Sequence, residues 1–424
     1  MLHIMLQLAA TTTFVLAVRA PADSSSGSGG GSSPGCRLSS PTTLHAGAQA
    51  TRTLRQKTDG TTRTYSVHVP ASYEQRKPSA LVLAFHGWGD SGWAMGDVVS
   101  AAGNAAGYLL VAPDGLGETN AGSYENRNSW NGGGTTQVPF PGPKGPTCNE
   151  AGVSEQGKVY CYKSCSLRPG GCHACDWTTC NDDIAFVSQL LDELETEFCI
   201  DPARVYATGF SNGATFTYAL GASLPQRIRA IAPSSGTPLL GFSSDPVAAG
   251  QSVLDIHGDF DNTCPANRST VSSDGWYYTT VDETLTHWLN VNGCRANPSH
   301  YPTSLDGQLG LFCVNIAADC QTRLVRCAWH AEHAIYPDIG KLIIEFFEPP
   351  PAHGQQQQQE EANAAQCTAE LNTHCDGARR ASVGNCFLCA EQVSRAQGAD
   401  NHCSGVGPLY STLVDNFCQQ KSDR

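Results

Sequence analysis

The central part of the chain alternates short apolar runs with longer stretches in which apolar residues recur every three or four positions. Five of the runs have the form of strands buried on both faces of a parallel sheet: 81–85, 108–112, 204–208, 230–232 and 252–256. Residues 182–198 instead carry apolar positions spaced as on one face of a helix: Ile184, Val187, Leu190, Leu191 and Leu194. The pattern therefore predicts alternating strands and helices joined by short loops.

Further helices are predicted from residue 212 and over 342–347, and a further strand over 322–325. This alternation predicts an α/β fold over residues 51–348, with a mainly parallel sheet flanked by helices. The interval 139–180 breaks the alternation because it is rich in Gly and Pro and holds six cysteines. A loop of this length inside a domain is usually functional, and we expect disulfides to hold it in place.

The composition indicates a folded, exported protein. Apolar residues make up 40% of the 424 positions, and the net charge of −13 argues against a nucleic-acid-binding surface. Nineteen cysteines are typical of disulfide-bonded, secreted chains. An apolar stretch at 4–18 is followed by Ala20-Pro21-Ala22, which has the form of a cleavage site. We therefore expect a signal peptide over 1–22 and a secreted, extracellular protein without a membrane span.

Two low-complexity segments flank the central region. Residues 23–50 are rich in Ser and Gly and residues 349–362 in Pro and Gln, so both are predicted to be linkers. Residues 363–424 form a C-terminal module with six cysteines. A segment this small needs bridges to fold, and three are expected, although the sequence does not choose their pairing. The module would bind a polymer or a surface, or would only add stability.

The motif with the clearest chemical meaning is Gly209-Phe210-Ser211-Asn212-Gly213. It matches G-x-S-x-G and lies directly between a predicted strand and a predicted helix. In that context the serine occupies a strained turn, where glycines two residues away avoid clashes with the flanking elements. Ser211 is therefore predicted to be a nucleophile, and the N–H of Asn212, at the start of a helix, to be an oxyanion donor. The alternative is a chance match in a glycine-rich chain.

A serine hydroxyl needs a base and an orienting carboxylate, which follow the nucleophile along the chain in this kind of site. After a predicted strand the sequence offers Asp259 and Asp261, and we predict Asp261; either could instead cap a turn. The loop before the last predicted helix offers His330 and His333, and we predict His333. The spacing of these two histidines is not that of a helical zinc pair, so no metal or other cofactor is expected.

The second oxyanion donor is expected in the turn after the first buried run. There the N–H of Gly87 or Trp88 would face the nucleophile, although a plain strand-to-helix turn is the alternative. Three tryptophans are expected to shape the substrate pocket: Trp88, Trp130 and Trp177. The segment 139–180 would overhang this pocket, unless it only decorates the surface.

The cysteines of 139–180 allow two interpretations. Four of them could bind zinc as thiolates: Cys161, Cys165, Cys172 and Cys175. In an exported chain the same spacing more often means disulfides, which we predict. Thirteen cysteines precede the C-terminal module, so one is left over or pairs with that module. Asn267-Arg268-Ser269 is a candidate glycosylation site.

Several motifs occur in a fixed order: His86-Gly87 after a buried strand, Asp182-Asp183-Ile184-Ala185-Phe186-Val187, Asp201-Pro202-Ala203-Arg204-Val205-Tyr206, the serine motif, His257-Gly258 with Asp261, and His333 near Tyr336-Pro337. The set resembles the secreted feruloyl esterases and polyhydroxybutyrate depolymerase-like esterases, over about residues 60 to 348. This resemblance implies an α/β-hydrolase fold, a Ser-Asp-His triad and ester hydrolysis through an acyl-enzyme. The chain departs from the family pattern at Ala214 and at Ala331-Glu332, which leaves the substrate open.

We therefore predict a secreted serine carboxylic-ester hydrolase, a feruloyl esterase acting on cell-wall polysaccharide. A polyhydroxyalkanoate depolymerase and an acetylxylan esterase are the near alternatives. A serine peptidase on the same scaffold and a non-catalytic binding protein are more distant ones. The expected partner is an ester carried on a polymer, and not a nucleic acid.

Overall fold

The computed structural model describes residues 32–38, 43–118, 127–132, 147–149, 162–167, 171–172, 175–240, 248–267, 272, 275–318, 320–348, 369 and 371–375. The predicted signal peptide and the 349–362 linker lie outside these residues, as do large parts of the 23–50 linker, the 139–180 segment and the C-terminal module. The chain divides into two units, Met1–Ile344 and Glu345–Arg424. In the second unit, residues 371–375 are helical, and Cys375 is buried and disulfide-bonded.

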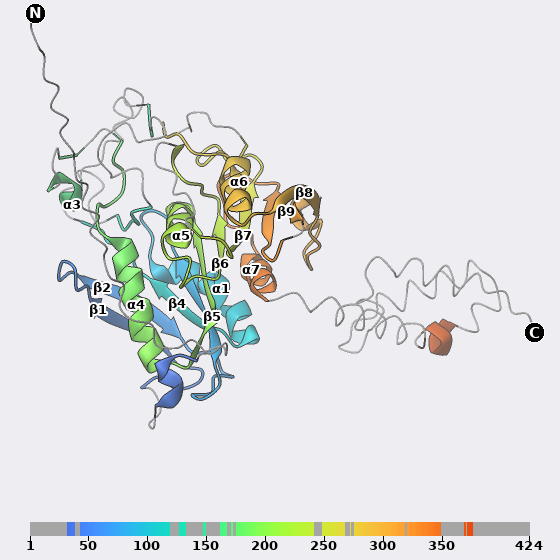
Figure 1. The fold of residues 1–424 in the computed structure, drawn as a ribbon, viewed down its shortest axis with the longest axis horizontal. Coiled ribbons are helices and arrows are strands. Elements are labelled where there is room, and N and C mark those ends of the chain that lie inside the picture. The colour runs from blue at the N-terminus through green and yellow to red at the C-terminus, as the bar shows by residue number, and fades with distance from the viewer. Residues whose placement is uncertain are drawn as a thin grey trace, which may run out of the picture. The chain divides into compact units, whose positions relative to one another are not determined.

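Ten strands form one sheet within the described residues (Figure 1). In chain order they are β1 (Gln49–Arg55), β2 (Thr62–His68), β3 (Ser79–Phe85), β4 (Leu109–Pro113), β5 (Ile200–Phe210), β6 (Ala230–Ser234), β7 (Ser252–Gly258), β8 (Arg295–His300), β9 (Phe312–Ala318) and β10 (Leu324–Trp329). Across the sheet their order is β1-β2-β4-β3-β5-β6-β7-β10-β9-β8.

Six neighbouring strands in the middle of the sheet, from β4 to β10 in that order, are parallel. The hairpin β1–β2 and the strands β9 and β8 add antiparallel pairs at the two edges. This strand order confirms the predicted α/β-hydrolase fold with a mainly parallel sheet. Because parallel strands share one carboxyl edge, the loops after β3, β5, β7 and β10 meet there.

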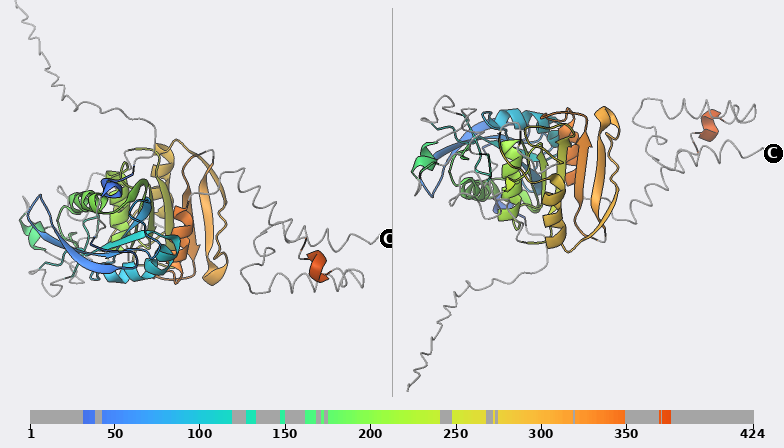
Figure 2. Two further views of the ribbon diagram at one scale, coloured as in Figure 1. Left: turned by 90° about the horizontal axis from the view of Figure 1, so that it is seen from below. Right: turned by 90° about the horizontal axis from the view of Figure 1, so that it is seen from above.

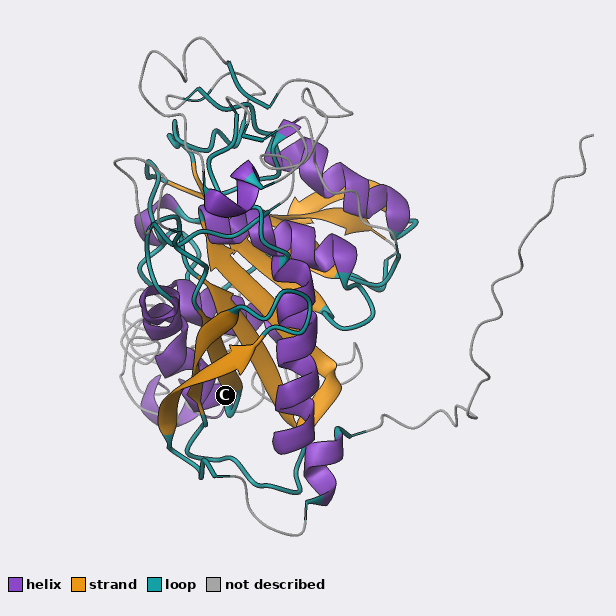
Figure 3. Cartoon of the chain, turned by 90° about the vertical axis from the view of Figure 1, so that its left-hand side faces the viewer, coloured by secondary structure: helices purple, strands orange, loops and turns teal. Residues whose placement is uncertain are grey.

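The helices are η1 (Pro34–Arg37), α1 (Gly92–Ala106), α3 (Lys163–Ser166), α4 (Asp183–Glu197), α5 (Asn212–Ser223), α6 (Val281–Val291), η4 (Gln308–Gly310) and α7 (Ile339–Phe347). α1 lies on one face of the sheet, and α4 and α5 lie on the opposite face (Figure 2). Figure 3 shows helices packed beside the strands of the sheet. α4 begins where the Asp182 carboxylate accepts a hydrogen bond from the Ala185 N–H, at 2.9 Å, which satisfies a free donor of the first turn.

Burial explains why the apolar runs form the centre of the sheet. β3, β4 and β6 are buried along almost their whole length, whereas every residue of β8 is exposed. Three disulfides link segments of this domain: Cys36–Cys199, Cys294–Cys320 and the cross-strand pair Cys313–Cys327. Within the described residues, no helix has the length and apolar character that crossing a membrane requires.

Candidate active site

Ser211 occupies a sharp turn between β5 and α5. Its backbone has φ 56° and ψ −118°, a conformation that L-residues rarely adopt and that costs about 1–3 kcal/mol. The turn is possible because its flanking glycines lack side chains. A Cβ on Gly209 would collide with the carbonyl of Gly213, and one on Gly213 would collide with the carbonyls of Phe85 and His86. The motif therefore folds as the sequence predicts, with the serine at the carboxyl edge of the sheet.

The three residues predicted as nucleophile, base and carboxylate lie in hydrogen-bond contact. The His333 Nε2 is 2.9 Å from the Ser211 Oγ, and the His333 Nδ1 is 2.8 Å from the Asp261 Oδ2. Asp261 comes from the loop after β7, and His333 from the loop after β10. Because an ionised carboxylate only accepts hydrogen bonds, the Nδ1 carries the proton, and the Nε2 can accept the serine proton.

The Asp261 side chain is fully buried, and its environment favours the ionised form. Its Oδ1 accepts hydrogen bonds from the backbone N–H groups of Thr263, at 2.9 Å, and Cys264, at 2.8 Å. Burial alone would raise the pKa of this carboxyl. The nearby imidazoles of His257 and His333 outweigh burial and hold the Asp261 pKa well below its ordinary value. Asp261 is therefore an ionised acceptor behind the imidazole.

The alternative candidates, Asp259 and His330, face each other instead of Ser211. The His330 Nδ1 is 3.3 Å from the Asp259 Oδ2, and 69% of the His330 side chain is exposed. The His330 ring also lies beside Phe260, a largely exposed side chain. The two alternatives therefore form a separate pair at the surface.

The predicted oxyanion side of the site has two elements. Asn212 is the first residue of α5, and its side-chain amide is fixed by the Trp130 backbone, accepting from the Trp130 N–H at 2.7 Å and donating to the Trp130 carbonyl at 3.0 Å. The Gly87 turn lies close to the serine, since a Cβ on Gly87 would stand 3.6 Å from the Ser211 Cβ. The Gly87 turn therefore lies against Ser211, and Asn212 follows Ser211 at the start of α5.

Trp130 does not line an open pocket, contrary to the prediction. Its side chain has no exposed surface, stacks on Phe216 with ring centroids 5.1 Å apart, and donates a hydrogen bond from Nε1 to the His86 carbonyl at 3.1 Å. The pattern of tryptophans along the chain could not reveal this burial. Trp130 is therefore a core residue that supports the serine turn through its hydrogen bonds to Asn212 and to the His86 carbonyl.

A buried ion pair that the sequence did not reveal supports the same region. The Arg63 Nη1 is 2.7 Å from the Asp183 Oδ1, and both side chains are fully buried. The other Asp183 oxygen accepts the Asn131 N–H at 2.7 Å, next to Trp130. The pair therefore anchors the segment that holds Asn212.

Trp88 and Trp177, the other two predicted pocket residues, lie in a row of half-buried and buried rings. The ring centroids of Trp88 and Trp177 are 6.4 Å apart, and those of Trp177 and Trp276 are 5.8 Å apart. Trp276 was not predicted. The Trp88 Nε1 donates to the Tyr162 hydroxyl at 3.1 Å, which links the predicted oxyanion turn to the cysteine-rich segment.

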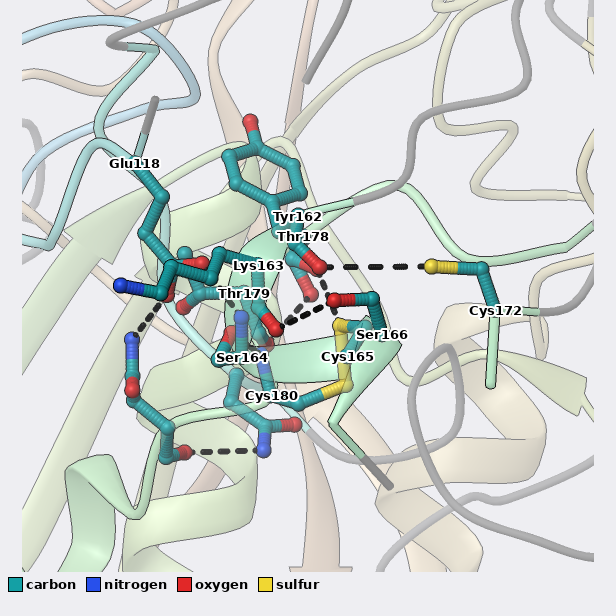
Figure 4. The surroundings of a disulfide bond; sticks show 12 residues. Glu118, Tyr162, Lys163, Ser164, Cys165, Ser166, Cys172, Thr178, Thr179 and Cys180 are labelled. Carbon is teal, nitrogen blue, oxygen red and sulfur yellow. Dashed lines mark hydrogen bonds between the residues drawn. A yellow bond between two sulfur atoms is a disulfide. The ribbon is translucent and has the colours of Figure 1, made fainter. Parts of the chain in front are cut away.

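Disulfides hold the described part of the cysteine-rich segment. Cys165 pairs with Cys180 (Figure 4) and Cys148 with Cys175, and Cys172 is also disulfide-bonded. The zinc alternative for these thiols is therefore wrong, since a bonded sulfur is no thiolate ligand. Cys264 is a buried thiol. In the candidate glycosylation site, Asn267 is exposed, and residues 268 and 269 lie outside the described residues.

A second histidine, His257, lies close to Asp261. Its side chain is fully buried between Asp255 and Asp261. Burial by itself lowers the pKa of an imidazole, but the two carboxylates raise the pKa of His257 to about 10. The two carboxylates therefore favour the protonated form of His257.

The fold and the site define an α/β-hydrolase-fold protein with a Ser-His-Asp arrangement at the carboxyl edge of its sheet. The chain is similar in sequence to feruloyl esterases, as its motifs predicted. It is 28% identical over 144 residues to feruloyl esterase C of Emericella nidulans, covering 33% of this chain and 47% of that protein. It is 26% identical over 207 residues to the probable feruloyl esterase C of Aspergillus terreus, covering 48% and 68%.

The chain spans about half the length of the first of these relatives. No family model matches the chain. Among solved structures, an acetyl xylan esterase from Aspergillus awamori matches with a TM-score of 0.43 and 14% identity, over 70% of this chain and 98% of that one. The fold assignment rests on the strand order of this protein itself.

Proposed function

We propose that the protein is a serine carboxylic-ester hydrolase. Ser211 is the nucleophile, His333 the general base and acid, and Asp261 the orienting carboxylate. The observation that carries this proposal is the continuous hydrogen-bonded chain from the Ser211 hydroxyl through His333 to Asp261, with contacts of 2.9 and 2.8 Å. The sequence similarity to feruloyl esterases supports an ester as the substrate.

Acylation follows from this arrangement. The Ser211 Oγ attacks the ester carbonyl carbon while its proton passes to the His333 Nε2, and Asp261 stabilises the resulting imidazolium. The negative charge that forms on the carbonyl oxygen is met by the N–H groups of Asn212 and of the Gly87–Trp88 turn. A single donor of this kind lowers the barrier by about 3–4 kcal/mol.

The tetrahedral intermediate then collapses. The C–O bond to the alcohol breaks, and the His333 Nε2 returns its proton to the departing oxygen. A water molecule next attacks the acyl carbon with His333 as base, and the second collapse releases the acid and restores the Ser211 hydroxyl.

We assign a hydroxycinnamoyl ester on a cell-wall polysaccharide as the substrate. The half-buried rings of Trp88 and Trp177 support a planar aromatic acyl group, because flat rings offer large apolar contact area to such a group and Trp88 follows Gly87, which lies close to Ser211. Acetylated xylan and polyhydroxyalkanoate are the competing substrates. The disulfides support export to an oxidising compartment. The esterase domain begins before the predicted residue 51, because β1 begins at Gln49 and the Cys36–Cys199 disulfide ties part of the predicted 23–50 linker to the domain. We keep 363–424 as a separate module.

Purified protein assayed side by side on methyl ferulate, acetylated xylan and polyhydroxybutyrate tests this proposal. Methyl ferulate should be the best substrate, and Ser211→Ala should lower its kcat by about 10⁴-fold or more. Ser100→Ala, at a half-buried serine on α1 whose hydroxyl donates to the Asp97 carbonyl, is the matched control and should keep full activity. Preference for acetylated xylan or polyhydroxybutyrate would overturn the substrate assignment, and unchanged turnover in Ser211→Ala would overturn the mechanism.

A further inference from the structure

His257 lies at the carboxyl end of β7 between two carboxylates. Its Nδ1 is 3.4 Å from the Asp255 Oδ1, and its Nε2 is 3.4 Å from the Asp261 Oδ2. The Nε2 also donates a hydrogen bond to the Cys264 carbonyl at 2.8 Å. Only 1% of the residue is exposed, so this imidazole cannot take part by contacting a substrate.

Groups from the neighbouring elements complete the surroundings of His257. From α5, the Tyr218 hydroxyl donates to the Asp255 Oδ2 at 2.7 Å, and burial followed by the charge of Asp255 raises the Tyr218 pKa well above its ordinary value. From β10, Arg326 is close enough to oppose that rise, but its guanidinium forms an ion pair with Asp282 at 2.7 Å. Asp255 therefore faces both the Tyr218 hydroxyl and the His257 imidazole.

We propose that His257 is a positioning residue that keeps the Asp261 carboxylate ionised and oriented toward His333. Asp255 and Tyr218 in turn hold His257 in place. This inference rests on the proposed function. A carboxyl buried as deeply as Asp261 is neutral by default, and a neutral carboxyl could no longer stabilise the imidazolium form of His333. A positive charge 3.4 Å away offsets that burial. The bond to the Cys264 carbonyl fixes the loop whose N–H groups hold Asp261.

His257→Gln is the first test because glutamine can still donate to the Cys264 carbonyl but carries no charge. Loss of a buried cation raises the pKa of the groups around it, so the acid limb of the kcat/KM profile should move to higher pH. We expect kcat to fall by about 10- to 100-fold, the range typical when a supporting partner of a functional side chain is removed, with KM unchanged. His300→Gln, at a surface His–Asp pair of 3.0 Å, is the matched control and should change neither parameter.

Asp255→Asn is the second variant, and it should change the alkaline limb of the kcat/KM profile. The amide keeps the shape and can still accept from Tyr218, but it no longer stabilises the proton on His257. Activity should therefore fall at a lower alkaline pH than in the wild type. All rates are expressed per active site titrated with a fluorophosphonate, so that misfolded protein does not count. If His257 and Asp255 had a purely structural role, the variants would show a smaller fraction of titrated active sites, and neither the acid nor the alkaline limb of the kcat/KM profile would move.

The outcomes separate this inference from the proposed function. Wild type that fails to react with the fluorophosphonate would overturn the proposed function. Wild type that reacts, with His257→Gln showing the wild-type kcat and acid limb, would overturn only the positioning role. The pH dependence of thermal unfolding gives a readout without catalysis. In His257→Gln the folded-state pKa of Asp261 rises toward its unfolded value of about 4, so the loss of stability below that pH should be smaller than in the wild type, and an unchanged loss would likewise overturn the role.

Discussion

Asp261→Asn is the sharpest perturbation of the predicted triad because the structure dictates how the amide must orient. The Oδ1 position accepts two backbone N–H groups, from Thr263 and Cys264, so the amide oxygen must stand there. The amide nitrogen then replaces Oδ2 and donates to the His333 Nδ1. That bond forces the His333 proton onto Nε2, which can no longer accept the proton of Ser211.

We expect a loss in kcat of about 10⁴-fold, the size found when the orienting carboxylate of a serine triad becomes an amide, which corresponds to about 5 kcal/mol of barrier. Steady-state hydrolysis of methyl ferulate measures it, with circular dichroism to verify folding. Asp259→Asn is the matched control: it alters the alternative acid two residues away, whose partner is the exposed His330, and should retain activity within about twofold. Asp261→Asn with more than about a tenth of wild-type kcat, or an equal loss in Asp259→Asn, would refute the assignment.

Three stability predictions follow from buried contacts. Gly213→Ala places a methyl group against backbone carbonyls at the end of β3 and should cost about 3 kcal/mol in urea unfolding; a fully stable variant would contradict the steric explanation. Asp183→Asn leaves Arg63 charged, buried and poorly paired, and should cost about 3–5 kcal/mol in the same assay, whereas a loss under 1 kcal/mol would show that the pair is dispensable. The lowered pKa of Asp261 adds stability that is present above its unfolded pKa of about 4 and is lost as the pH falls through the folded value. The raised pKa of His257 adds stability that is present below about pH 6.5 and is lost as the pH rises toward about 10. Together the two groups predict that Tm declines on both sides of about pH 5–6.5. A Tm that rises from about pH 6.5 to 9 would contradict this charge assignment.

The central sheet could be predicted from the sequence, but its edges could not. Runs such as 81–85 are continuous and apolar because both faces of their strands are buried. β8 has six exposed residues and no apolar run, so nothing in its sequence marks a strand. β5 begins at Ile200, before the predicted 204. Ile200 is buried and pairs with Ser79, but residues 201–204 are half-buried or exposed and lie at a break in the register with β3, so no apolar run marks this start.

The serine turn was predictable because steric limits tie its glycines to one local conformation. The carboxylate and the histidine were each one of two neighbours in a loop, and only the three-dimensional arrangement separates Asp261 and His333 from Asp259 and His330. His257 shows the limit most clearly. The direction in which a histidine points after a strand is not visible in the sequence. The proposed role of His257 depends on Asp255 and Tyr218, and no sequence motif connects Tyr218 with the other two residues.

Labelling with a fluorophosphonate tests the central claim most directly, because the reagent traps only a serine whose proton a neighbouring base can remove. Intact mass and peptide mapping should find one label per chain, on Ser211, with none in Ser211→Ala and full labelling in Ser100→Ala. Ester turnover by a protein that takes no label on Ser211, or a label that maps to another residue, would contradict the account.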